Sequence, residues 1–303
     1  MDTLVTITVV SDSKDSAEKA IDAAFTEIEI LEKLLNFYLH DSEIANINNQ
    51  AGISGVKVSA DVFEVLNKTL YVSEMTEGAF DVTIGPVSML YDFHKKIKPS
   101  EYGIKKNLQL VNYRYLVLDK DTSTVFLMKK GMLVDPGGIT KGFAADKAVE
   151  VLKKRGIHSG LVSVAGDIKT FGLKPDGKPW KIGIRDARAV DKEDDVMGTI
   201  ELKDKAISTS GDYERFFILD GQRYHHLLNP KTGYPALGCR SVSVITSEAV
   251  FTDAFATGAF VLGPEKGLKL LERLEFEGVI VDNQGKIYVT AGLRGKIELK
   301  KSF

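Results

Sequence analysis

A long amphipathic stretch near the N-terminus constrains the fold more than any other feature of this sequence. Between Ser13 and Tyr38, apolar side chains recur at three- and four-residue steps, and Ser13 and Asp15 can cap the start. This spacing puts the apolar side chains on one face, so it predicts a long helix that packs against a core. The apolar face consists of Ala17, Ile21, Ala24, Ile28, Leu31 and Leu35.

Further helices are expected later in the chain. The interval 59–75 begins with a capping serine and carries apolar residues at helical spacing. The interval 140–154 is followed by Gly156, whose missing Cβ permits a left-handed C-terminal cap. Two more intervals with helical spacing, 249–262 and 265–274, predict a return to helix near the C-terminus.

Strands are expected at the opening of the chain and through most of its second half. The first ten residues read as a strand, and a turn at 119–121 predicts a hairpin between 115–118 and 124–128. A second turn at 283–285 predicts a closing hairpin between 279–281 and 287–289. Other strands are expected at 161–164, 180–185, 199–202, 206–209, 216–219 and 241–246.

This order of elements favours an α+β protein that forms a single compact body, with mixed or antiparallel sheets and flanking helices. The chain of 303 residues is roughly twice the usual domain size, so the body over 1–303 could consist of two intertwined lobes. We find no internal repeat, low-complexity tract or linker in the sequence.

Composition excludes several classes of protein. A content of 44% hydrophobic and 27% charged residues excludes disordered, collagen-like and coiled-coil chains. A formal net charge of -2 leaves no cationic excess, so we do not expect a general nucleic-acid binder. The single cysteine, Cys239, excludes an internal disulfide and a multi-cysteine metal site. No apolar run is long enough to cross a bilayer, and we see no signal peptide, although a chain trimmed of its leader would look the same.

A glycine-bearing turn at 135–142 is the first cluster that could carry chemistry. Its sequence, Asp-Pro-Gly-Gly-Ile-Thr-Lys-Gly, lies between a predicted strand and a predicted helix. Glycines let the backbone approach a ligand closely, and the amides and dipole at a helix start favour phosphate. The spacing is neither that of a Walker loop nor that of a dinucleotide fingerprint. A plain strand-to-helix turn therefore stays open as the alternative.

Asp253 and Thr257 form the second cluster, near the start of the predicted helix at 249–262. Residues four apart on a helix face the same way, so both oxygens point in one direction. This pair is too small to enclose calcium, but it suits magnesium, which retains waters and shares phosphate oxygens of a substrate. The alternative is that Thr252 and Asp253 merely cap the helix.

Two adjacent histidines, His225 and His226, form the third cluster, just before a Pro-Lys-Thr-Gly turn. Histidine can transfer protons near neutral pH. Alternation along a strand would send the two rings to opposite faces, so at most one is expected to enter a shared site. A zinc role is disfavoured, because the other histidines, His40, His94 and His158, do not lie at ligand spacing.

Three further clusters, 78–86, 165–168 and 208–213, read locally as turns. Phe80 could stack on a planar ring, although a lone aromatic residue beside a turn is more often part of the core. The sequence contains no Gly-x-Ser-x-Gly elbow, and Cys239 has no recognisable partner motif. Acyl-transfer hydrolysis is therefore not expected.

Taken in order, these clusters resemble the ApbE family of FAD:protein FMN transferases, and the resemblance spans almost the whole chain. Any one motif would be weak evidence, but seven or eight matches in the same order are specific. The matching segments are Met1 to Thr3 (Met-Gly-Thr in the family), 38–43 (Tyr-x-x-x-Ser-Glu), 78–86 (Gly-Ala-Phe-Asp-x-Thr-x-Gly-Pro), 135–142 (Asp-x-Gly-Gly-Ile-Ala-Lys-Gly), 166–168 (Gly-Asp-Ile), 208–213 (Ser-Thr-Ser-Gly-Asp-Tyr), 226–233 (His-x-x-Asp-Pro-x-Thr-Gly) and 253–257 (Asp-Ala-Leu-Ala-Thr).

The resemblance implies a site that holds FAD with a magnesium ion at its pyrophosphate. Asp253 and Thr257 match the side-chain metal ligands, and the main chain of Gly138 and of Ala256 would complete the protein's share. The positions that match FAD-binding residues are Met1, Tyr38, Ala79, Phe80, Asp81, Asp135, Lys141 and Leu227.

The resemblance also implies the reaction. A threonine or serine hydroxyl of an acceptor protein would attack the FMN-side phosphorus, AMP would depart, and FMN would stay attached through a phosphoester bond. The acceptors resemble flavin-bearing subunits of membrane ion-pumping redox complexes. An extracytoplasmic, lipid-anchored location is implied for the full-length protein, with a cytoplasmic location as the alternative.

Within this scheme, we expect His226 to act as the base for the incoming hydroxyl and His225 to pack on the opposite face. Three residues depart from the family pattern: Asn229 replaces an Asp near the histidines, Thr140 replaces Ala, and Asp2 replaces Gly. The same site could act instead as an FAD diphosphatase, with water in place of the acceptor hydroxyl. A non-catalytic flavin-binding protein is a third possibility, less favoured because the metal and base positions are all filled.

Overall fold

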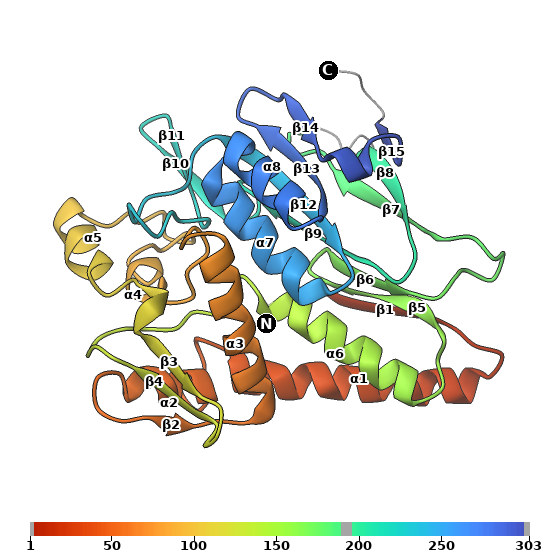
Figure 1. The fold of residues 1–303 in the computed structure, drawn as a ribbon, viewed down its shortest axis with the longest axis horizontal. Helices are drawn as coiled ribbons and strands as arrows, with labels where there is room; N and C mark the ends of the chain where they lie inside the picture. The colour runs from red at the N-terminus through yellow and green to blue at the C-terminus, as the bar shows by residue number, and fades with distance from the viewer. Residues whose placement is uncertain (1–2, 189–195, 300–303) are drawn as a thin grey trace.

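The computed structural model describes residues 3–188 and 196–299, where helices and antiparallel strands form one body (Figure 1). The α+β class is confirmed. The helices are α1 (Lys14–Leu35), α2 (Glu43–Asn49), α3 (Ala60–Met75), α4 (Gly85–Ser88), α5 (Glu101–Leu108), α6 (Thr140–Lys154), α7 (Ala249–Leu262) and α8 (Pro264–Arg273). The strands are β1 (Val5–Val10), β2 (Val56–Lys57), β3 (Leu116–Asp119), β4 (Thr124–Leu127), β5 (Ser159–Val164), β6 (Asp167–Phe171), β7 (Trp180–Arg185), β8 (Val196–Leu202), β9 (Ala206–Gly211), β10 (Phe216–Leu219), β11 (Gln222–His225), β12 (Cys239–Thr246), β13 (Glu277–Asp282), β14 (Ile287–Val289) and β15 (Ile297–Leu299).

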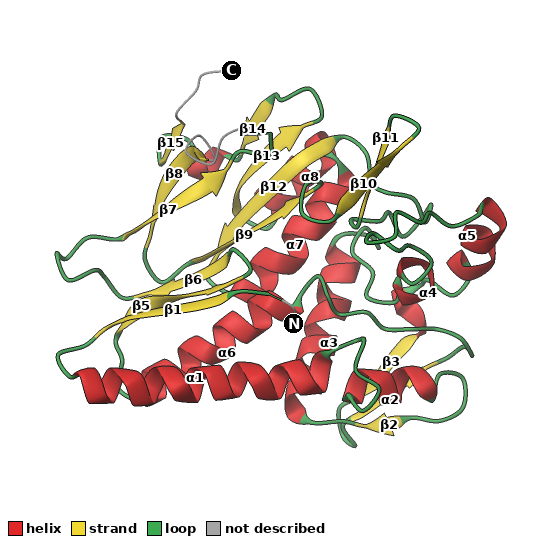
Figure 2. Ribbon diagram, turned by 180° about the vertical axis from the view of Figure 1, so that it is seen from behind, coloured by secondary structure: helices red, strands yellow, loops and turns green. Residues whose placement is uncertain are grey.

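A seven-stranded antiparallel sheet forms the centre of the molecule, in the order β1-β5-β6-β9-β12-β13-β14. Helices α6 and α7 pack against it, and α1 packs against α6 (Figure 2). Two three-stranded sheets, β15-β8-β7 and β2-β4-β3, lie around this centre, and β10-β11 forms a separate hairpin.

Helix α1 confirms the prediction drawn from the N-terminal spacing. The Ser13 side chain accepts a hydrogen bond from the Ser16 amide, which satisfies one of the free donors at the helix start. The apolar face is buried in the main hydrophobic core from Ala24 to Leu35, whereas Ala17 and Ile21 are only partly buried. The helix ends at Leu35, three residues before the expected end, because Asn36 is in an extended conformation.

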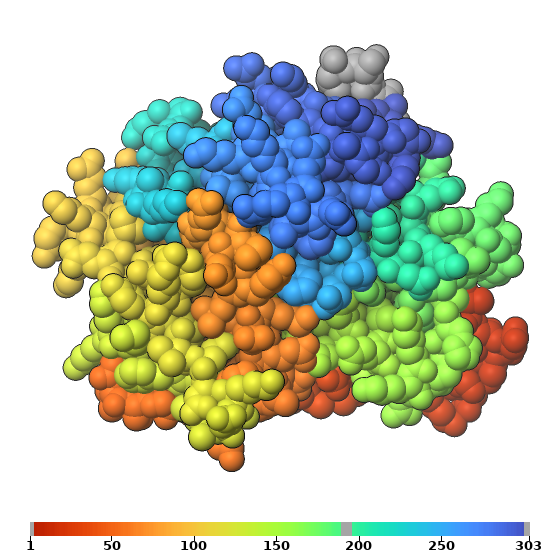
Figure 3. All heavy atoms as spheres, in the orientation of Figure 1, coloured from red at the N-terminus to blue at the C-terminus, as the bar shows by residue number. Residues whose placement is uncertain are grey.

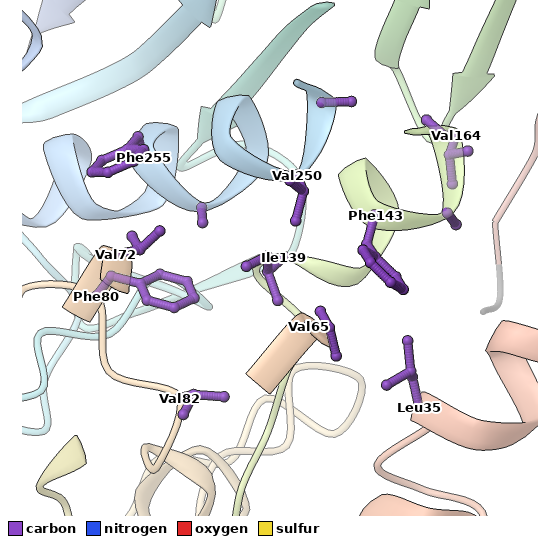
Figure 4. Packing of buried hydrophobic residues seen from close by; sticks show 14 of the residues in the cluster. Leu35, Val65, Val72, Phe80, Val82, Ile139, Phe143, Val164, Val250 and Phe255 are labelled. Carbon is purple, nitrogen blue, oxygen red and sulfur yellow. The ribbon is translucent and has the colours of Figure 1, made fainter. Parts of the chain in front are cut away.

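Helices α6 and α7 cross closely enough to bring their N-terminal ends together. Gly142 makes this crossing possible, because a Cβ there would lie 2.0 Å from the backbone oxygen of Ala249. Figure 4 shows Ile139 and Phe143 at the start of α6 in the same cluster of buried side chains as Val250 on α7. The two predicted motifs at 135–142 and 253–257 therefore start from adjoining elements.

Short elements account for most differences from the expected structure. The spacing did not predict α2, α4, α5 or β6, because each has too few residues to show a period. The cluster at 208–213, interpreted as a turn, instead begins within strand β9. Residues Met1 and Asp2 lie outside the described ranges. Within those ranges, no helix combines the length and the apolar character that crossing a bilayer requires.

Candidate active site

The glycine-bearing turn and helix α7 meet at Gly138. A Cβ on Gly138 would lie 3.1 Å from Cε2 of Phe80 and 3.6 Å from Oγ1 of Thr257, so a side chain there would crowd the Phe80 ring. The turn is held at its start by a hydrogen bond from the Asp135 amide to the Val82 carbonyl. Gly138 and the Thr257 hydroxyl are thus neighbours, and their binding of a metal stays a prediction.

Asp253 lies inside helix α7 and points toward the turn. Its Oδ2 accepts a hydrogen bond of 3.1 Å from the Gly142 amide. Helix α7 begins at Ala249, and the Asp146 carboxylate accepts from the first two amides of the helix. The alternative in which Asp253 merely caps the helix is therefore wrong. One helical turn on, Thr257 shares a 3.1 Å hydrogen bond with the Ser210 hydroxyl on β9.

Lys141 connects two buried carboxylates. Its Nζ forms an ion pair with Asp167 and lies 3.3 Å from Oδ1 of Asp253. Although burial opposes the charge, the two carboxylates raise the pKa of Lys141 above its ordinary value, so it stays an ammonium. Burial raises the pKa of the Asp167 carboxyl, an effect that Lys141 counteracts and Asp253 reinforces. The three side chains form one charge cluster, in which Lys141 holds both acids in place.

Asp167 is a functional candidate that sequence reasoning missed. It is the first residue of β6 and follows a tight turn in which Ala165 has φ 53° and Gly166 has φ 89°. The turn prediction for 165–168 is confirmed, but no chemistry was assigned to its acid. Its burial (2% exposed) is visible only in the structure, and the one signal in the sequence is an acid directly after the Ala165-Gly166 turn.

Asp135 anchors a second polar group at the other end of the turn. Its carboxylate accepts hydrogen bonds of 3.1 Å from the Ser88 hydroxyl and the Gly137 amide. Burial raises the pKa of Asp135, against the effect of these bonds and of the Arg215 guanidinium. Tyr38 is 70% exposed. Among the described residues, no hydrogen bond joins its hydroxyl to Asp135, so a shared role of the two residues at FAD stays a prediction.

The run from Ala79 to Asp81 is buried, and its acid is already bonded within the chain. The Asp81 carboxylate accepts from the amide and hydroxyl of Thr83, at 2.8 and 2.6 Å, and from the Tyr113 amide at 2.9 Å. Phe80 lies in the main core near Ile139 and Val72 (Figure 4). The Asp81 side chain thus stabilises the loop, and contact between this run and FAD stays a prediction.

The two histidines diverge, as strand alternation predicts. His225 is buried, places its Nε2 3.0 Å from the Ala236 carbonyl, and packs edge-on against Phe260. His226 is only partly buried, and its Nδ1 lies 3.3 Å from the Arg215 carbonyl. Burial, then the charges of Arg215 and His225, lower the pKa of His226 to about 3, and Lys141 adds to this. The His226 imidazole is therefore neutral at neutral pH.

The chain after His226 is held by its own backbone. Leu227 is buried, and its carbonyl accepts a hydrogen bond from the Ala236 amide. The Asn229 side chain accepts from the Lys231 amide at 2.9 Å, so it shapes the turn. The Asn229 amide, which replaces the family's carboxylate, thus shapes the loop that follows His226, and among the described residues it makes no hydrogen bond with the imidazole.

The donors around Gly138 fit a magnesium ion. Thr257, beside Gly138, and its partner Ser210 offer hydroxyls, and Asp253, one helical turn earlier, offers a carboxylate that Gly142 and Lys141 also contact; all three are hard oxygen donors. In the described part of the chain, no three His, Cys, Asp or Glu side chains cluster as a metal cage. Such a sparse set suits an ion that keeps waters and shares phosphate oxygens. Ala256 is buried in α7, and its predicted main-chain role is not tested by this geometry.

Comparison with known proteins gives consistent matches along the chain. The model of the ApbE family matches residues 1–280. The FAD:protein FMN transferase of Treponema pallidum (strain Nichols) is 35% identical over 276 residues, which cover 86% of this chain and 75% of that protein. A protein of the same name from Klebsiella pneumoniae (strain 342) is 32% identical over 285 residues, 91% of this chain and 86% of that protein.

Solved structures show the same fold. The crystal structure of the ApbE protein of Thermotoga maritima has a TM-score of 0.90 at 31% identity and covers 97% of this chain and 96% of its own. The flavin transferase ApbE of Vibrio cholerae has a TM-score of 0.83 at 28% identity, with coverage of 97% and 96%. With a family model over most of the residues and relatives above 30% identity, this chain belongs to the ApbE family.

Proposed function

We propose that this chain is an FAD:protein FMN transferase that moves FMN from FAD to a threonine or serine hydroxyl of an acceptor protein and releases AMP. The observation that carries the proposal is the meeting of the glycine-bearing turn with Asp253 and Thr257 of α7, beside Lys141. Relatives of this chain bear the name of that activity. Phosphoryl-type transfer needs alignment and charge cancellation more than a protein nucleophile, and this site offers both.

The chain's own residues have distinct tasks in this reaction. Asp253, Thr257 and the main chain of Gly138 would hold magnesium, which supplies charge neutralisation at the FAD pyrophosphate when it is bound. Lys141 adds a fixed positive charge next to Asp253. The Gly138 amide would be the donor of the turn to phosphate oxygens, because the amides of Gly137, Ile139, Thr140 and Gly142 already donate within the chain. These groups cancel the charge that builds up as AMP departs.

His226 is the proposed base. The acceptor's hydroxyl oxygen forms a bond to the FMN-side phosphorus, the bond from that phosphorus to the bridging oxygen breaks, and AMP takes the bond's electron pair. The hydroxyl proton moves to the imidazole. Burial, then the charges of Arg215 and His225, lower the pKa of His226 to about 3, so the ring is neutral at neutral pH but only weakly basic. The negative charge of a bound FAD pyrophosphate would raise this pKa, which the ring needs in order to take the proton.

The acceptor and the compartment are part of the same proposal. We propose a flavin-bearing subunit of a membrane redox complex as acceptor, and an extracytoplasmic place of reaction for the full-length protein. The support is the family resemblance of the motifs. Localising the product of the complete gene by cell fractionation tests the second point.

The deciding experiment incubates the protein with FAD and magnesium, with and without an acceptor domain. We expect yellow fluorescence covalently attached to the acceptor, together with AMP. Free FMN and AMP formed at the same rate without acceptor would favour FAD diphosphatase activity instead, since water would then replace the hydroxyl. A mass increase of the acceptor by one FMN, lost when its threonine or serine is replaced, identifies the bond.

A further inference from the structure

A groove of about 520 Å³ lies beside the candidate site, between the chain that follows α4 and the β10-β11 hairpin. Tyr91, Tyr224 and Tyr234 line it, together with Lys98. Figure 3 shows the hairpin, in teal, next to the yellow surface around α5 at one end of the molecule. None of the residues assigned to FAD or metal lines this groove.

Strand β11 links the groove to His226. Gln222 and Tyr224 both line the groove, as alternate residues of one strand face. The hairpin pairing continues past the strand, because the His226 amide donates to the Arg215 carbonyl at 3.1 Å. His226 is therefore the next residue in the alternation, about 7 Å beyond Tyr224 along the chain.

Helix α4 separates the groove from the Asp135 end of the site. Ser88, at the end of α4, donates to the Asp135 carboxylate, whereas Tyr91, three residues on, lines the groove. The Tyr91 hydroxyl donates to the Gly233 carbonyl at 2.9 Å, which ties this segment to the loop after His226. The groove and the predicted FAD site thus flank one short helix, and His226 lies near both.

The chemistry of the groove suits a polypeptide. Its floor is aromatic, because Tyr91 and Tyr224 pack with Phe217 in a cluster of buried side chains. Tyr234 is 41% exposed at the mouth. The Lys98 ammonium donates to the Tyr224 hydroxyl at 3.3 Å and lies 5.3 Å from the centre of its ring, and Glu101 lines the same groove without an ion pair to Lys98 among the described residues. Tyrosine-rich surfaces are typical of protein-binding sites.

We propose that this groove binds the segment of the acceptor protein next to the modified hydroxyl, with an apolar side chain against Tyr224 and Tyr234 and an oxygen accepting from Lys98. The continuity with His226 supports this occupant, because a chain lying in the groove would reach the base without crossing the FAD site. The inference rests on the proposed transferase function. The groove would then determine which threonine or serine is modified.

The test uses the full chain, FAD, magnesium chloride and a library of short peptides, each with one threonine between randomised neighbours. Flavin fluorescence and mass spectrometry identify the labelled peptides. We expect the wild-type protein to label a subset that shares residues on one side of the threonine. For a peptide from that subset, Lys98→Gln and Tyr234→Ala should each raise KM about tenfold, as the loss of an interface contact does.

Matched controls separate the groove from general effects. Lys106→Gln and Tyr102→Ala change exposed residues of α5 that do not line the groove, and both should keep the wild-type KM and peptide preference. The affinity for FAD, measured by fluorescence titration, should be unchanged in all four variants.

Each possible result bears on a different claim. Unchanged KM and peptide preference in Lys98→Gln and Tyr234→Ala would overturn the groove assignment while leaving transfer intact. An equal loss of FAD affinity in those variants would also overturn it, because it would place the groove in the FAD site. No labelling of any peptide or acceptor by the wild-type protein would contradict the transferase proposal itself.

Discussion

The Lys141 cluster and the His226 corner are built in opposite ways. Lys141, Asp167 and Asp253 come from α6, β6 and α7, elements packed into the main core, and their charges are paired before any ligand arrives. His226 follows a two-stranded hairpin that pairs with no other strand of the described sheets. In the proposed reaction, charge cancellation would therefore reside in the packed centre, and proton acceptance at the periphery, where an acceptor protein could reach it.

The largest expected effect tests the Lys141 cluster, in the core of the molecule. Asp253→Ala should lower the rate of magnesium-dependent transfer by about a thousandfold or more, since a charge that aligns the phosphates is lost. Measuring transfer against magnesium concentration checks this. Asp253→Asn is the matched control for shape, because its amide oxygen can still accept from Gly142. Unaltered turnover in the alanine variant, with the fold intact by circular dichroism, would refute the metal assignment.

The second-largest expected effect tests the role of His226, at the periphery. His226→Ala should lower kcat for transfer by about a hundredfold, the usual contribution of a positioned base, and should change FAD affinity much less. Single-turnover kinetics and FAD titration separate the two quantities. His225→Ala is the control, because it removes a neighbouring ring that packs in the interior. Equal losses of rate and affinity in the His226 variant would make it a binding residue.

The third prediction asks how much the paired charges contribute to stability. Lys141→Met should lower the free energy of unfolding by about 3 kcal/mol, because Asp167 and Asp253 lose their common partner. Urea denaturation measures this loss. Adding Asp167→Asn to that variant should recover part of it, since one uncompensated charge disappears. If both variants unfold at the wild-type urea concentration, the cluster does not contribute to stability.

The smallest expected effect is on how the free energy of unfolding depends on pH. Since the folded-state pKa of His226 is lowered from 6.5 to about 3, the unfolded chain binds a proton that the folded chain does not. This contribution to stability is present above about pH 6.5 and is lost as the pH falls toward 3. Between about pH 7.5 and pH 5, His226→Gln should lose less stability than the wild type in urea titrations. His158→Gln, at an exposed position, is the matched control. Identical slopes for His226→Gln and the wild type would show that burial does not act on this ring.

Patterns local to the chain allowed much of this to be predicted. The bounds of α6, α7, β7 and β10 agree with the spacing, because helical and strand periods depend on neighbouring residues alone. The order of the motifs also identified the family that the comparisons show. The divergence of His225 and His226 followed from the period of two along a strand.

Contacts between distant residues could not be predicted in this way. Asp167 and Lys141 are 26 positions apart, and Asp253 and Gly142 are 111 apart, so neither pairing leaves a local period. Asp81 matches a ligand-binding motif, yet only the fold shows that Thr83 and Tyr113 already bond to it. By itself, the sequence determined which side chains could bind phosphate, metal or a proton. The tertiary structure decided which of them share a space, because burial and charge pairing depend on elements that the chain brings together only when it folds.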